Sequence, residues 1–186
     1  MNSAQGGMVT ADNRGPDGKS LRTWPECLRI GQVLGDEAMR IVESAPEQKE
    51  PKLFCVAKMI SFPVESPLLR AVMMASPLGY PTNDLARVTT QVNLVNVGNA
   101  QILTIPGEAL PNIGYYLKRK MRGEHNLLFG LTNDAFGYML TRVDWGSFKR
   151  YDYITRTSLG EMTGEILIEE ALKMVAEHPA PARIAK

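Results

Sequence analysis

Two runs of residues place side chains capable of chemistry where a strand gives way to a glycine-containing turn. The first is Ile-Pro-Gly-Glu-Ala-Leu-Pro at 105–111, and the second is Gly-Leu-Thr-Asn-Asp-Ala-Phe-Gly-Tyr at 130–138. Catalytic groups concentrate in such loops because the rigid scaffold ends there and the backbone can open towards a ligand. Glu108 and Tyr138 are therefore the leading candidate site residues.

Each of these two residues has two interpretations. The carboxylate of Glu108 can coordinate a metal ion or act as a general base, but it can equally stabilise the N-terminus of the helix expected after it. The hydroxyl of Tyr138 can donate a hydrogen bond to an oxyanion or, more rarely, bind a metal. It can equally belong to a core aromatic residue whose hydroxyl is satisfied internally.

The other candidate groups lie in loops or at the ends of elements. Thr10 lies in a loop that begins with two glycines, where it could serve as a nucleophile or an orienting group, or the segment could be an ordinary turn. Tyr151 precedes the last helix and could form a wall of the same pocket or simply lead into that helix. His125 and His178, the only histidines, have no partner at metal-ligand spacing and indicate surface or capping roles.

The composition is that of a globular chain of 186 residues with a net charge of +1, long enough for one domain with a sizeable core. A net charge this close to zero argues against a nucleic-acid partner, because there is no excess of basic residues to neutralise phosphates. A basic run at 118–122 indicates a helix end favoured by the macrodipole, and the alternative is a site for anionic headgroups. No segment is apolar enough to span a membrane, and the N-terminus is not a signal peptide. Cys27 and Cys55 are expected to be buried thiols.

The periodicities predict mixed helices and strands without a regular βαβ repeat. The fold class is therefore α/β or α+β, with a mixed β-sheet flanked by helices, in what we expect to be an incomplete domain. Residues 1–24 are expected to be an extended loop and 180–186 a frayed tail. The expected elements are helices at 25–45, 67–75 and 110–121 and around 168–175, strands at 53–60, 88–94, 101–105 and 126–131, and a hairpin turn at 98–99.

Several motifs occur in an order that resembles one known family, the neutral/alkaline (non-lysosomal) ceramidases. The resemblance extends over nearly the whole chain, 1–186, and corresponds to the C-terminal half of that family's catalytic domain. The matching runs are Gly-Gly-Met-Val-Thr-Ala-Asp at 6–12, Arg-Ile-Gly at 29–31, Ile-Pro-Gly-Glu at 105–108, the run at 130–138, Tyr151, and Thr-Ser-Leu-Gly at 157–160.

The resemblance implies a zinc centre and hydrolysis of an N-acyl amide bond by a zinc-bound water. In that family the ligands are histidines from the N-terminal half, with a glutamate that matches Glu108 and a tyrosine that matches Tyr138. Thr10 matches a serine near the metal and is the implied catalytic hydroxyl, and Tyr151 is implied to contact the substrate. The family also suggests a secreted, periplasmic or membrane-surface location.

The chain departs from the family pattern at several points, and these departures leave alternative functions open. The histidine-bearing half is absent, so the expected partner is a missing N-terminal segment or a second chain, and this chain alone is expected to be inactive. Thr10 replaces a serine, which leaves open another N-acyl compound in place of ceramide as the lipid-like substrate. The remaining alternative is a non-catalytic module that binds an apolar ligand or a partner protein.

Overall fold

The computed structural model describes residues 2–7, 11, 13–79, 86–147, 149 and 152–182. The chain divides into two compact units. One unit comprises Met1–Met8 and Glu50–Lys186, and the other comprises Val9–Lys49. The two units are described separately below.

The larger unit is built on a four-stranded mixed sheet, which confirms the predicted class. Its strands follow the order β1-β2-β3-β5, with β1/β2 and β2/β3 antiparallel and β3/β5 parallel. The hairpin turn at 98–99 joins β2 to β3, as predicted. The strand bounds are Leu53–Pro63 for β1, Arg87–Val97 for β2, Ala100–Thr104 for β3 and His125–Phe129 for β5.

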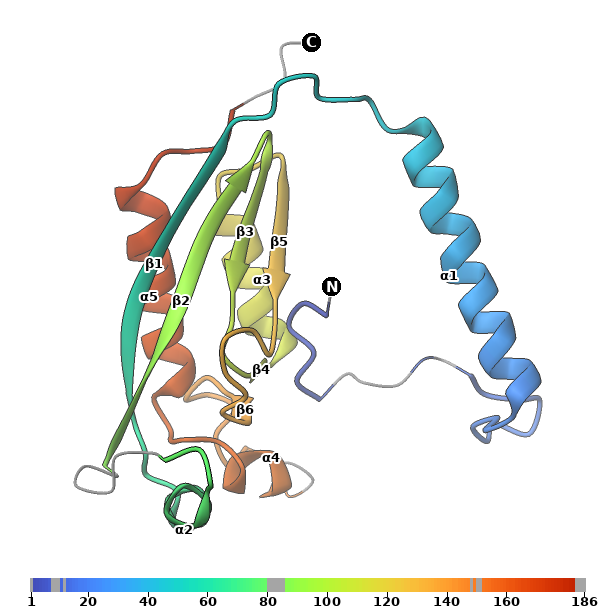
Figure 1. The fold of residues 1–186 in the computed structure, drawn as a ribbon. Coiled ribbons are helices and arrows are strands. Elements are labelled where there is room, and N and C mark those ends of the chain that lie inside the picture. Colours follow the sequence, from blue (N-terminus) through green and yellow to red (C-terminus); the bar gives the residue numbers. More distant parts are fainter. Residues whose placement is uncertain are drawn as a thin grey trace. The chain divides into compact units, whose positions relative to one another are not determined.

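Two helices cover one face of this sheet. Helices α3 (Pro111–Lys120) and α5 (Thr163–Glu177) contact each other and the strands behind them (Figure 1). The alternation along each strand sends every second side chain towards these helices. The fully buried core side chains include Leu94, Leu103, Leu117, Leu128 and Leu167.

The remaining elements of the larger unit are short and lie beyond the ends of the sheet strands. Helix α2 spans Pro67–Ala75, α4 spans Asp152–Arg156, and a second, two-stranded sheet pairs β4 (Glu108–Ala109) with β6 (Tyr138–Met139). The tail residue Ala182 donates a backbone hydrogen bond to Gly98 at 3.1 Å. No helix in the described part of the chain is both long and apolar enough to cross a membrane.

The smaller unit consists mainly of helix α1, Trp24–Ser44. Thr23 caps it by accepting a hydrogen bond from the Glu26 backbone N–H, and Pro25 occupies the first turn, as its fixed φ allows. No residue of α1 is buried, and its apolar stripe is open: the side chains of Leu34 and Val42 are 67% and 70% exposed. An amphipathic helix normally buries such a stripe.

Two details differ from the sequence expectations. Strand β1 continues past Ile60 to Pro63, which is paired with Arg87; proline is tolerated there because β1 is an edge strand and this is its last residue. The expectation of buried thiols is wrong, because Cys27 and Cys55 are both free and exposed. Cys27 lies on the open helix α1, and Cys55 alternates onto the sheet face away from α3 and α5.

Candidate functional site

The two candidate loops leave the same edge of the sheet. Because β3 and β5 are parallel, their carboxyl ends lie side by side, and this is the edge at which open α/β sheets commonly bind ligands. The residues after β3 lead within four positions to Glu108, and those after β5 lead to Tyr138. The fold therefore brings together two residues that are 30 positions apart in the sequence.

Backbone hydrogen bonds join the two loops along their length. The carbonyl oxygens of 105–107 each accept a hydrogen bond from the second loop, and the second loop accepts one in return. The donor–acceptor pairs are Thr132 to Ile105 at 3.1 Å, Phe136 to Pro106 at 3.0 Å, Leu131 to Gly107 at 3.2 Å and Glu108 to Gly137 at 2.8 Å. These bonds do not depend on any candidate side chain, so they join the two loops whatever residues occupy positions 108 and 138.

Glu108 and Tyr138 are direct cross-strand partners in the β4/β6 ladder. Tyr138 also forms a parallel bridge with Ser158 on its other side. Residues directly opposite one another on neighbouring strands project from the same face. Glu108 on β4, Tyr138 on β6 and Ser158 in the segment after α4 therefore form one row, which we call the site row.

Glycines allow these strands to approach closely. Gly137 has a φ of 78°, and a Cβ atom placed on it would lie 2.0 Å from the carbonyl oxygen of Thr157. A Cβ on Gly107 would lie 2.6 Å from the carbonyl oxygen of Gly137. A larger residue at 107 would push β4 and β6 apart, and one at 137 would push β6 away from the segment at 157–158.

The N-terminal segment borders the site row from the other side. The backbone N–H of Gly6 donates to the Ala109 carbonyl at 2.9 Å, and a Cβ on Gly6 would lie 2.5 Å from the Glu108 carbonyl oxygen. Two candidate residues, Thr10 and Tyr151, lie outside the described residues. Their roles stay predictions.

The electrostatics of the site row centre on the Tyr138 hydroxyl. Partial burial, the neighbouring Glu108 carboxylate, the nearby Tyr153 hydroxyl and a hydrogen bond to Glu108 all raise the pKa of Tyr138 above its usual value near 10. Tyr138 therefore keeps its proton at neutral pH, beside the carboxylate of its cross-strand partner Glu108. The Tyr153 ring packs edge-on against the Tyr138 ring, with centroids 5.8 Å apart and an interplanar angle of 73°.

The capping alternative for Glu108 is not what the structure shows. Helix α3 begins at Pro111, its N-cap residue is Leu110, and no side chain makes a cap hydrogen bond there. The basic residues Lys118–Lys120 occupy the last turn of α3, as the macrodipole interpretation predicts. Glu108 thus lies before the helix and interacts with Tyr138 instead.

Ser158 is the site-row member that sequence reasoning did not select. It is fully buried, and its Oγ has no hydrogen-bond partner among the described residues. A buried, unsatisfied hydroxyl is unusual in a native protein and calls for an explanation such as a functional role or a bound group. The run at 157–160 pointed to this stretch, but nothing in the sequence indicated a contact with Tyr138.

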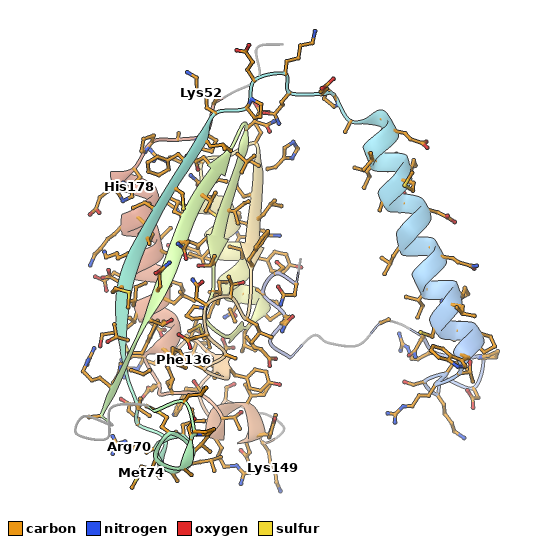
Figure 2. The ribbon with its side chains drawn as sticks, viewed as in Figure 1. Lys52, Arg70, Met74, Phe136, Lys149 and His178 are labelled. Carbon is orange, nitrogen blue, oxygen red and sulfur yellow. The ribbon has the colours of Figure 1, made fainter. Side chains whose placement is uncertain are left out.

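The two histidines lie at the opposite end of the sheet. His125 opens β5 opposite Ala100, the first residue of β3. The His178 ring packs on Phe54 with centroids 5.8 Å apart, near the same end, and Figure 2 shows it far from Phe136 of the site loop. At roughly 3.3 Å per residue, the five residues of β3 separate His125 from the site row by about 16 Å. Neither histidine can join Glu108 and Tyr138.

The site row contains two side chains with oxygen atoms suited to a metal, Glu108 and Tyr138, which is fewer than the ligands that a metal site needs. Catalytic zinc sites use three protein ligands, from histidine nitrogen, carboxylate oxygen or cysteine sulfur. Within the described ranges, no group of three or more histidine, cysteine, aspartate or glutamate residues is close enough to hold a metal ion. The residues present therefore fit part of a metal site.

Comparison with known proteins yields matches in structure only. No family model matches the chain, and no curated protein matches it in sequence. Among solved structures, it is similar to a ceramidase complexed with C2, with 13% identity and a TM-score of 0.59 over 92% of this chain and 38% of the other. Neutral ceramidase from Pseudomonas aeruginosa gives 14% identity and a TM-score of 0.58 over 92% of this chain and 36% of the other.

These matches show the fold. The chain folds like part of a ceramidase, and it spans less than two-fifths of the length of the structures that it matches.

Proposed function

We propose that this chain is the C-terminal part of a ceramidase-like catalytic domain, in which it supplies Glu108 and Tyr138 to a zinc centre. The remaining ligands come from a part of the fold that this chain does not span, either an upstream segment or a second polypeptide. The observation that carries the proposal is the direct pairing of Glu108 with Tyr138 at the end of the parallel strands. Of all the candidate residues, these are the two that the resemblance assigns as ligands.

The chain's own residues would hold and orient two oxygen atoms. The Glu108 carboxylate lies beside the protonated Tyr138 hydroxyl, so the pairing of β4 with β6 brings a negative charge and a hydroxyl together. A cation placed against both oxygens would favour the deprotonated hydroxyl and so lower the raised pKa of Tyr138. Zinc in such a centre would polarise an amide carbonyl and lower the pKa of a coordinated water.

The proposed reaction is hydrolysis of the N-acyl amide bond of ceramide or of a related N-acyl lipid. Thr10 would contribute the hydroxyl near the reacting carbonyl, and Tyr151 would contact the substrate. This chain alone is proposed to be inactive.

Native mass spectrometry of the protein purified from its own cells tests the proposal. We expect one zinc ion per assembly and a second polypeptide, or a longer form of this chain, that carries the missing ligands. Glu108→Gln should lose the zinc and keep the partner, because it changes one ligand oxygen and little volume. Glu177→Gln, on the last residue of α5, is the matched control and should keep both.

The outcomes separate the candidate functions. Bound zinc together with hydrolysis of ceramide would support the proposed ceramidase reaction. Bound zinc with hydrolysis of short N-acyl amines alone would support amide hydrolysis with a substrate other than ceramide. A metal-free monomer, or zinc that survives Glu108→Gln, would contradict the proposal. That result would favour the non-catalytic alternative, a module that binds an apolar ligand or a partner protein.

A further inference from the structure

The outer side of α3 combines exposed aromatic rings with clustered positive charge. Its inner side is buried, whereas Tyr115 and Tyr116 are 67% and 39% exposed. Positive charges occupy the last turn of the helix and the residue shortly after it. We call this surface the basic tyrosine patch; it consists of Tyr115, Tyr116, Lys118, Arg119, Lys120 and Arg122.

The charge of the patch is not neutralised by neighbouring acids. Lys118, Arg119 and Lys120 make no ion pair with another described residue, whereas Lys58 and Lys173 both pair with Glu170 at 2.6 and 2.9 Å. Glu124 is the one acidic residue between 111 and 125, and it accepts a hydrogen bond from Asn99. Between residues 111 and 125 the sequence thus has four cations and one carboxylate, in a chain whose net charge is only +1. One of the four, Arg122, donates a hydrogen bond from its guanidinium to the His178 carbonyl oxygen.

The aromatic residues and a small hollow give the patch a second property. The Lys120 ammonium lies 5.8 Å from the centre of the Tyr116 ring. A hollow of about 220 Å³ opens beside Tyr115 and Lys118, lined also by Ser3, Ala4, Pro111 and Gly114. A hydroxyl and an ammonium beside one small hollow suit a phosphate group, while the exposed rings suit the boundary between lipid headgroups and acyl chains.

We propose that the basic tyrosine patch docks on a membrane surface that carries anionic phospholipid headgroups. Clusters of four or more Lys or Arg residues attract such surfaces, and tyrosine anchors at the interface. A nucleic acid is the less suitable partner, because the four cations lie within the short segment 118–122 and the whole chain has a net charge of only +1. The inference goes beyond the proposed amide hydrolysis and does not require zinc or a second chain.

Sedimentation of the chain with lipid vesicles tests this inference. The vesicles are phosphatidylcholine alone and a two-to-one mixture of phosphatidylcholine with phosphatidylglycerol. We expect binding to the mixed vesicles only, weakening as salt rises because the attraction is electrostatic. Each cation near such a surface contributes about a fivefold increase in affinity, so the triple variant Lys118→Gln, Arg119→Gln, Lys120→Gln should bind at least tenfold more weakly.

A matched control changes the same net charge elsewhere. Lys19→Gln, Arg29→Gln and Arg40→Gln remove three cations from the smaller unit, where each is paired with an acid. This control should bind as the unmodified chain does. Tyr115→Ser should weaken binding several-fold and leave its salt dependence unchanged. Circular dichroism of every variant checks that the fold persists.

Three outcomes would overturn the inference. Equal binding to both vesicle types would show that anionic headgroups are not recognised. Equal binding of the patch variant and the control would place the contact elsewhere, and the open apolar stripe of α1 would be the first surface to consider. Displacement of the chain from mixed vesicles by a short oligonucleotide at lower concentration than by soluble phosphatidylglycerol would assign the patch to nucleic acid.

Discussion

Replacing Gly137 by alanine adds only a Cβ atom, yet it should strongly disrupt the site row. Gly137 precedes Tyr138 and has a φ of 78°, in the left-handed region that L-residues avoid. The added Cβ would lie 2.0 Å from the Thr157 carbonyl oxygen. That oxygen accepts the Tyr138 backbone N–H at 3.3 Å, so relief of the clash must lengthen or break this bond.

The expected cost follows from these two effects. A left-handed conformation costs an L-residue about 1–2 kcal/mol, and loss of one backbone hydrogen bond costs about 0.5–1.5 kcal/mol. Gly137→Ala should therefore lower the free energy of unfolding by about 2–3 kcal/mol. At roughly 2–4 °C per kcal/mol for a chain of this size, the midpoint of thermal unfolding should fall by about 4–12 °C.

Urea unfolding followed by circular dichroism measures this loss, with Gly146→Ala as the matched control. Gly146 also has a positive φ, 62°, but nothing lies within 4 Å of its added Cβ. The control should lose only the conformational cost of about 1–2 kcal/mol. If the two variants unfold at the same urea concentration, the close approach of Gly137 to Thr157 does not stabilise the fold and the reasoning is wrong.

Three further predictions concern the same row. Ser158→Ala should leave the chain equally stable or more stable by about 1 kcal/mol, because it removes a buried hydroxyl without a partner, and a clear fall in the urea midpoint would show that the hydroxyl is satisfied. Because its pKa is raised, Tyr138 holds its proton more tightly in the folded than in the unfolded state, so its contribution to stability is full below about pH 10 and falls as the pH rises. The Tyr138→Phe variant has no proton to lose and should therefore lose less stability than the unmodified chain above about pH 10. Urea midpoints at a series of alkaline pH values test this. Gly6→Ala should release the N-terminal segment, because its Cβ would lie 2.5 Å from the Glu108 carbonyl oxygen, and unchanged resistance of 1–8 to limited proteolysis would contradict this.

Local patterns in the sequence were sufficient to predict most of the elements. Alternation of apolar and polar residues predicted β2, and Gly98-Asn99 predicted the hairpin that joins it to β3. Helix α1 follows from its apolar spacing and from Pro25 and Pro46 near its two ends. These signals are local, because they depend on side-chain period and on backbone restrictions within a few residues.

Those local signals could not predict which residues of the site pair with one another. Glu108 and Tyr138 were each recognisable as candidates, but their pairing depends on a parallel ladder between distant segments. Ser158 joins the site row through an isolated β-bridge to Tyr138, and the hydrophobic periodicity of the sequence does not predict that bridge. The exposure of Cys55 likewise depends on which sheet face the helices cover, and that choice is made by packing across the whole unit.

The backbone geometry of the site row has a consequence for how the site would be completed. Glu108 and Tyr138 are positioned by hydrogen bonds between main-chain groups of the two loops, and glycines at 107 and 137 permit the close approach. Neither feature requires a metal or another polypeptide. A partner that carried the remaining ligands of the proposed site would therefore meet a backbone that is already ordered at 108 and 138, so little binding free energy would be lost in ordering these two loops. If the proposed metal bound through the Tyr138 oxygen, it would compete with the Tyr138 proton, whose pKa is raised, and metal binding would then weaken as the pH falls.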